Sequence, residues 1–131
     1  KGYDRVVYIG ISNNDLNETL LADLEEYAEP LLFIGRGIKP LIDRKYFNDI
    51  TFEGEGNWPV KVTYNGKDFT PGERFYQKIS VKNRDCQVLS SLSDGKNIYP
   101  YILKSSNLWY VSCLNTKGAL FYILADILHD F

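Results

Sequence analysis

The sequence is poor in the residues on which much enzyme chemistry depends: its 131 residues include one histidine, two cysteines and no methionine. General acid–base and metal chemistry rely heavily on histidine, and the single one, His129, adjoins Asp130 near the end of the chain. Paired histidines with metal-ligand spacing, a Cys-x-x-Cys pair and a Gly-x-Ser-x-Gly motif are all absent. The sequence therefore predicts no catalytic residues, no metal site and no cofactor.

Long blocks of one charge sign and long apolar runs are absent as well. Fifteen basic and seventeen acidic residues are interleaved and give a net charge of −2, whereas nucleic-acid-binding domains carry a concentrated basic patch. No apolar run approaches the roughly 20 residues that a membrane-spanning helix needs. We therefore expect no nucleic-acid partner and no membrane span in this segment, and the length fits one domain over residues 1–131.

The two cysteines, Cys86 and Cys113, each lie in an apolar, strand-like run. Cysteine is among the residue types most often buried, and a buried thiol behaves as a small hydrophobic group. Two buried thiols are therefore the favoured prediction, and a disulfide between them is the alternative.

The first third of the chain has the pattern of a strand–helix–strand unit. Residues 4–11 are a β-branched apolar run that predicts a central strand, and residues 15–28 have apolar side chains at helical spacing. Pro30 ends this helix, and residues 31–34 form a second buried strand. Such a unit carries a right-handed crossover. A second, shorter helix is expected from about residue 38 to 46.

The rest of the chain predicts antiparallel strands and a closing helix. The polar, Gly-rich residues 51–57 are expected to form a loop, and Asn65-Gly66 is a strong hairpin signal after the alternating residues 60–64. Further strands are expected at residues 76–82, 86–92, 98–104 and 108–114, and a helix at 117–129. This order predicts an α/β domain with a mixed sheet and an antiparallel β-rich elaboration.

The best-placed candidate binding site is the turn Gly35-Arg36-Gly37, which follows the second predicted strand. In open α/β sheets, ligands bind beyond the carboxyl ends of the strands. Glycines there let the backbone approach a ligand closely, and Arg36 with Lys39 would add positive charge suited to an anion. The alternative is that the two glycines only make a tight turn.

Aromatic residues are abundant, with ten tyrosines, seven phenylalanines and two tryptophans. Trp58 and Trp109 are candidate platforms for the C–H face of a sugar ring, because flat aromatic surfaces bury well against apolar faces. The alternative for both is packing in the core. Trp109 and Tyr110 are neighbours on one strand and therefore face opposite sides of the sheet, so at most one of them is a platform.

Short motifs along nearly the whole chain resemble a known family: Tyr3-Asp4-Arg5-Val6-Val7-Tyr8-Ile9-Gly10, Phe33-Ile34-Gly35-Arg36-Gly37, Val62-Thr63-Tyr64-Asn65-Gly66, Tyr99-Pro100-Tyr101, Leu108-Trp109-Tyr110-Val111 and Ala125-Asp126-Ile127-Leu128-His129-Asp130. In this order they resemble the region that precedes the deacetylase-like barrel in uncharacterised bacterial envelope proteins related to NodB-type polysaccharide deacetylases. The resemblance implies an extracellular or cell-envelope location. It also implies a larger parent protein, with the barrel after Phe131.

The same resemblance bears on activity. Deacetylase chemistry in such proteins would use one Asp and two His around a metal, and a chain with one histidine cannot supply that set. The start of the chain is also similar to the flavodoxin-like layered sandwich of class I glutamine amidotransferases. Where those enzymes place a nucleophilic Cys, this chain offers Gly35, Arg36 and Gly37, and the triad histidine is unmatched, so amidotransferase activity is not implied.

Three functional hypotheses follow. The first is a non-catalytic accessory domain whose partner is the downstream catalytic domain of the same chain, against which the largely apolar last helix would pack. The second is a glycan-binding module that uses Trp58 or Trp109 and has a polysaccharide as its partner. The third is a hydrolase or transferase that uses Cys86 or Cys113, with a degenerate amidotransferase-like hydrolase as its specific form.

Overall fold

The computed structural model describes residues 5–12, 14, 16–27, 30–43, 50–82, 85–106, 108–114 and 119–131. Its helices are α1 (Glu18–Glu26), α2 (Lys39–Ile42) and α3 (Ala119–Asp130). Its strands are β1 (Val6–Gly10), β2 (Leu31–Gly35), β3 (Ile50–Asn57), β4 (Lys61–Tyr64), β5 (Lys67–Phe69), β6 (Phe75–Val81), β7 (Gln87–Ser93), β8 (Ile98–Lys104) and β9 (Leu108–Val111).

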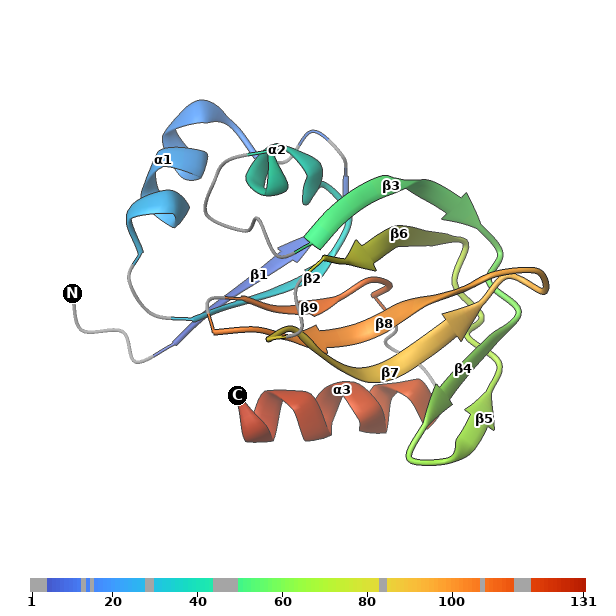
Figure 1. The fold of residues 1–131 in the computed structure, drawn as a ribbon. Helices are drawn as coiled ribbons and strands as arrows, with labels where there is room; N and C mark the ends of the chain where they lie inside the picture. The colour runs from blue at the N-terminus through green and yellow to red at the C-terminus, as the bar shows by residue number, and fades with distance from the viewer. Residues whose placement is uncertain are drawn as a thin grey trace.

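Seven strands form one mixed sheet in the order β1-β2-β9-β8-β7-β4-β5. The first three run parallel, and each later neighbour is antiparallel. A separate antiparallel ribbon of β3 and β6 lies with α1 and α2 over one face of the sheet, and α3 lies along the other face (Figure 1). The predicted α/β class with a mixed sheet is confirmed, although the protein is richer in strands than expected.

The main source of that difference is the segment 51–57, which the sequence predicted as a loop and which forms most of β3. Two of its glycines occupy strand positions that a larger residue would not fit well. The register with β6 shifts between Phe52 and Gly54, and a side chain at Gly56 would collide with the Tyr76 ring. Glycine is favoured at a β-bulge, as near Gly54, and where an aromatic ring packs directly on the backbone, as at Gly56. The glycines that suggested a loop are therefore part of a strand.

Strand β1 was predicted to be central, and this prediction is wrong within the described part of the sheet, where β1 is an edge strand paired only with β2. Its neighbour β2 is buried at all five positions, whereas Val7 and Ile9 of β1 are about half exposed. An apolar run indicates burial of a strand but does not report how many neighbours the strand has.

Two local predictions are confirmed by the backbone. Asn65 and Gly66 both have positive φ, at 51° and 76°, as the hairpin between β4 and β5 requires. Pro100 lies opposite Ser91 where the β7–β8 register shifts, so it sits at the irregularity that a proline in a strand predicts.

The helices differ from their predicted bounds mainly at their ends. Helix α1 begins at Glu18, three residues later than the start predicted at 15. Asn17 caps it, because its Oδ1 accepts a 2.8 Å hydrogen bond from the Leu20 N–H. Helix α2 spans only four residues in the described chain, and the predicted positions from 44 to 46 lie outside it. No helix of the described ranges is long and apolar enough to cross a membrane.

The sheet separates two hydrophobic cores because successive strand residues face opposite sides. The core under α3 includes Leu32, Ile34, Trp109, Val111, Ile123, Leu124 and Ile127. The core under α1, α2 and the ribbon includes Leu21, Leu24, Phe33, Leu41, Ile50, Ile79, Leu103 and Tyr110. The alternation therefore places Trp109 beneath α3 and Tyr110 beneath the ribbon.

Candidate functional site: a cleft at the ends of the parallel strands

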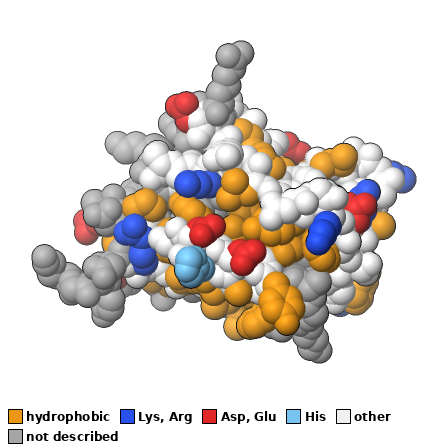
Figure 2. Space-filling view, turned by 90° about the horizontal axis from the view of Figure 1, so that it is seen from below, with side chains coloured by type: hydrophobic (Ala, Val, Ile, Leu, Met, Phe, Trp, Pro, Cys, Tyr) orange, Lys and Arg blue, Asp and Glu red, His pale blue; other side chains and the backbone are white. Residues whose placement is uncertain are grey.

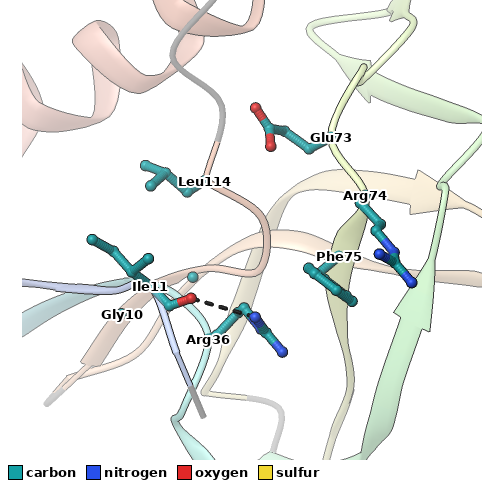
Figure 3. A pocket seen from close by; sticks show the side chains of 8 residues that line it. Gly10, Ile11, Arg36, Glu73, Arg74, Phe75 and Leu114 are labelled. Carbon is teal, nitrogen blue, oxygen red and sulfur yellow. Dashed lines mark hydrogen bonds between the residues drawn. The ribbon is translucent and has the colours of Figure 1, made fainter. Parts of the chain in front are cut away.

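An open cleft of about 420 Å³ lies where the parallel strands end. Gly10, Gly35 and Leu114 line it just at or beyond the carboxyl ends of β1, β2 and β9, and the segment Glu73, Arg74 and Phe75 that leads into β6 forms the opposite wall (Figure 3). This is the position at which open α/β sheets bind ligands, and its volume is within the usual range for small-molecule sites.

The floor of the cleft is built by the close approach of two strand ends. The Arg36 N–H donates to the Gly10 carbonyl at 2.9 Å, and the buried Tyr110 hydroxyl donates to the Gly35 carbonyl at 2.8 Å. Gly35 has φ of +95°, a Cβ on Gly35 would strike the Gly10 carbonyl of β1, and a Cβ on Gly10 would strike the Arg36 carbonyl just after β2. The predicted turn therefore has a packing reason for its first glycine, in addition to lining an open site.

Arg36 is held in place from several sides. Its guanidinium makes a two-pronged ion pair with Glu55, at 2.8 Å from Nε and 3.1 Å from Nη2, and stacks 4.0 Å from the Phe75 ring centre. The Gln77 amide donates to the same carboxylate at 2.7 Å. Because its charge is matched by Glu55, Arg36 is better suited to shaping the cleft than to supplying an unmatched positive charge.

Sequence reasoning missed Glu55 and Gln77, which join the ribbon to the Arg36 turn. Both follow from the β3–β6 register, in which these two residues are directly paired. If residues 50–57 had been predicted as a strand, its pairing with β6 would have indicated Glu55 and Gln77. Gly37 is buried and lines a neighbouring cavity of about 370 Å³, and Lys39 is exposed and paired with Asp43 at 2.8 Å.

Arg74 is the more available cation of the cleft. It is exposed, its Nε donates to the Asn57 amide oxygen at 3.3 Å, and its guanidinium lies 4.8 Å from the Phe75 ring centre. It forms no ion pair with any residue in the described ranges. Its carbonyl accepts a 2.6 Å hydrogen bond from the Trp58 N–H, so Trp58 lies at the same end of the ribbon.

The two candidate tryptophans differ completely in their surroundings. Trp58 has a left-handed backbone conformation, with φ of 54°, and its side chain is 65% exposed. Trp109 is 9% exposed and its ring packs edge-on against Phe131, at 5.3 Å between ring centres. The structure thus brings Trp58 next to the cleft residue Arg74 and places Trp109 in the core, not on an open platform.

Buried tyrosines give the fold a defined response to alkaline pH. Burial, and then the charges of Cys113 and Glu55, raise the pKa of Tyr110 well above its usual value of 10. Burial and the neighbouring Asp94 raise the pKa of Tyr76 to about 12. Both groups keep their protons longer in the folded chain than in the unfolded chain, so their contribution is complete below pH 10 and is lost as pH rises through the folded values.

We therefore expect the free energy of unfolding, measured in urea, to fall steeply above about pH 10, with roughly 2 kcal/mol of the loss by pH 12 due to Tyr76. Tyr76→Phe should make that decline shallower. Tyr122→Phe, at an exposed position, is the matched control and should leave the slope unchanged. A stability that stays flat from pH 9 to 12 would contradict this expectation.

The two cysteines are buried on opposite sides of the sheet. Cys86 is 7% exposed in the core under α1, Cys113 is 1% exposed in the core under α3, and neither is in a disulfide. The prediction of two buried thiols is confirmed, and the sheet between them rules out a bond. Neither thiol lies at the cleft wall or at an exposed turn.

Burial gives a testable expectation for thiol reactivity. In the native protein at neutral pH, we expect both cysteines to react with a small alkylating reagent about 100-fold or more slowly than in urea, because reaction requires opening of the core. Mass spectrometry of timed samples measures this for each residue. Fast native alkylation of Cys86 or Cys113 would instead support the hydrolase hypothesis.

Within the described ranges, no three His, Cys, Asp or Glu side chains are grouped as a metal site requires. His129 is exposed and lies 3.5 Å from the Asp130 carboxylate.

Comparisons with protein-family models, with curated proteins and with solved structures find no match to this chain. The cleft is therefore the feature on which a functional assignment can rest.

Proposed function

We propose that this chain is a non-catalytic accessory domain of an envelope-associated polysaccharide deacetylase-like protein, and that it binds glycan at the cleft. The observation that carries the proposal is the open cleft itself, in which Arg74 has no acidic partner among the described residues. Trp58, whose backbone N–H donates to the Arg74 carbonyl, is exposed. The resemblance in sequence supports the parent protein and the ligand class.

The chemistry of the cleft suits a polyhydroxylated ligand. Guanidinium groups offer several N–H donors in a fixed plane, which sugar hydroxyls or a uronic carboxylate can accept. Glu73, on the same wall as Arg74, can accept hydrogen bonds from sugar hydroxyls, and the Phe75 ring also lines the cleft. Trp58, whose backbone N–H donates to the Arg74 carbonyl, adds an exposed ring whose apolar surface suits C–H faces. Arg36, already neutralised by Glu55, keeps the wall of the site rigid.

The finer fold assignment is part of the same proposal. The parallel β1-β2-β9 strands with helices on both sides support a variant of the layered, class I glutamine amidotransferase-like sandwich. In this variant the turn after β2 carries Gly35, Arg36 and Gly37 in place of a nucleophile. A binding site at a strand end without a nucleophile favours recognition over hydrolysis.

Titration with cell-wall and chitin-type oligosaccharides, followed by tryptophan fluorescence and calorimetry, tests this function. We expect saturable binding that changes the emission of Trp58, with the buried Trp109 as an internal reference. Arg74→Ala should weaken binding about tenfold or more, equivalent to 1.4 kcal/mol. Lys96→Ala, at an exposed turn, is the control. No heat and no emission change at millimolar sugar would remove the glycan proposal.

A packing role against the downstream domain is the second candidate, favoured by α3. Its Phe121 and Leu128 are about half exposed, as are Val7 and Ile9 on the same face of the sheet. Hydrophobic side chains are in view among the charged ones on the face that carries α3 (Figure 2). Comparing the unfolding of this domain with and without its downstream neighbour tests the role, and equal stability would argue against it.

A further inference from the structure

A second hollow, of about 260 Å³, lies between the β4–β5 hairpin and the first half of α3. Figure 1 shows the hairpin beside the end of α3 at which the helix begins. Tyr64 and Phe69 reach the hollow from the two hairpin strands, and Tyr122 reaches it from the helix. Three aromatic rings, two from the hairpin and one from the helix, therefore line one small space.

The rings differ in exposure in a way that suits a binding surface. Tyr64 and Phe69 are partly buried against the core under α3 and so have fixed positions. Tyr122 is 74% exposed, although a ring of this size gains from burial. An open tyrosine opposite two anchored rings leaves room for a flat ligand between the helix and the hairpin.

Polar groups at the same hollow supply both hydrogen-bond donors and acceptors. Asp126 lies beside the Tyr64 hydroxyl, and burial together with the charges of Asp126 and Asp130 raises the pKa of Tyr64 above its usual value. Lys67 makes no ion pair with any residue that the structure describes, and it lies on the rim with Asn65.

We propose that this hollow is a second binding site, for one ring of a neutral saccharide. The C–H face of the ring lies against Tyr122 and Phe69, its hydroxyls donate to Asp126, and Lys67 donates to a ring or hydroxyl oxygen. The site shares no lining residue with the cleft at Arg74. The proposal therefore goes beyond the function proposed for the cleft, and each of the two proposals can be tested without the other.

Amide chemical shifts of the folded protein, recorded during titration with chitin-type oligosaccharides, test the inference. We expect shifts at residues 64–69 and 122–126, and Tyr122→Ala should weaken this set of shifts about tenfold or more while leaving the melting temperature nearly unchanged. Phe121→Ala, a neighbouring half-exposed residue that does not line the hollow, is the matched control and should leave the affinity unaltered.

The outcomes separate the two sites. Shifts confined to residues around Arg74 would overturn the second site and leave the cleft proposal standing. Shifts confined to the hollow, abolished by Tyr122→Ala and insensitive to Arg74→Ala, would support the second site and overturn the cleft. Equal losses from Tyr122→Ala and Phe121→Ala would overturn the inference, because a general effect on α3 would then explain both.

Discussion

Replacing Gly35 by alanine is expected to cost about 3 kcal/mol or more in the free energy of unfolding, whereas Gly95→Ala should cost only about 1–2 kcal/mol. The two glycines have nearly the same φ, +95° and +94°, in the region that favours glycine. A Cβ at Gly35 would lie 2.5 Å from the Gly10 carbonyl oxygen, while at Gly95 its nearest neighbour is a Val60 methyl at 3.7 Å. Both substitutions therefore pay for a positive φ, and only the one at Gly35 adds a collision with backbone.

A side-chain rearrangement cannot remove the collision at Gly35, because the Gly10 carbonyl oxygen belongs to the backbone of the paired strand β1. Moving Gly10 would also break the 2.9 Å hydrogen bond from the Arg36 N–H. Urea unfolding of both variants measures the difference in stability, and amide hydrogen exchange at Arg36 reports whether the strand ends have parted. Equal losses for Gly35→Ala and Gly95→Ala would show that conformation alone decides the cost.

The position of this turn could be predicted from sequence, but most of its partners could not. The strand–helix–strand pattern ending in Gly35 places the turn at the carboxyl end of a sheet, and the structure agrees. Glu55, Gln77 and Arg74 reach the same place through the β3–β6 ribbon. Their approach depends on long-range pairing, and composition around residues 51–57 suggested a loop instead.

The two tryptophans illustrate a second limit of sequence. Strand alternation required Trp109 and Tyr110 to face opposite sides, which the two cores confirm. The alternation of side chains along a strand does not show whether other elements cover both faces of the sheet. Trp109 is covered by α3 and the Phe131 ring, which follow β9 along the chain, and strand alternation does not show on which face of the sheet that helix packs.

Trp109→Ala is expected to lower the free energy of unfolding by about 3–5 kcal/mol, the usual range for removing a large buried aromatic side chain. For a chain of this length, that loss lowers the melting temperature by roughly 10–20 °C. Trp58→Ala should change stability by only about 0.5 kcal/mol, because its side chain is 65% exposed. Thermal unfolding followed by circular dichroism measures both.

Variants at the same two positions, Trp58→Ala and Trp109→Phe, separate stability from recognition. Trp58→Ala should keep the fold and lose sugar binding at the cleft, because it removes an exposed ring beside Arg74. Trp109→Phe keeps a ring against Phe131 and should retain both binding and most of the stability. If Trp109→Phe abolished binding while the fold persisted, Trp109 would act at the ligand after all. If Trp58→Ala unfolded the chain, its exposed ring would be a structural element and the cleft would lose its aromatic contact.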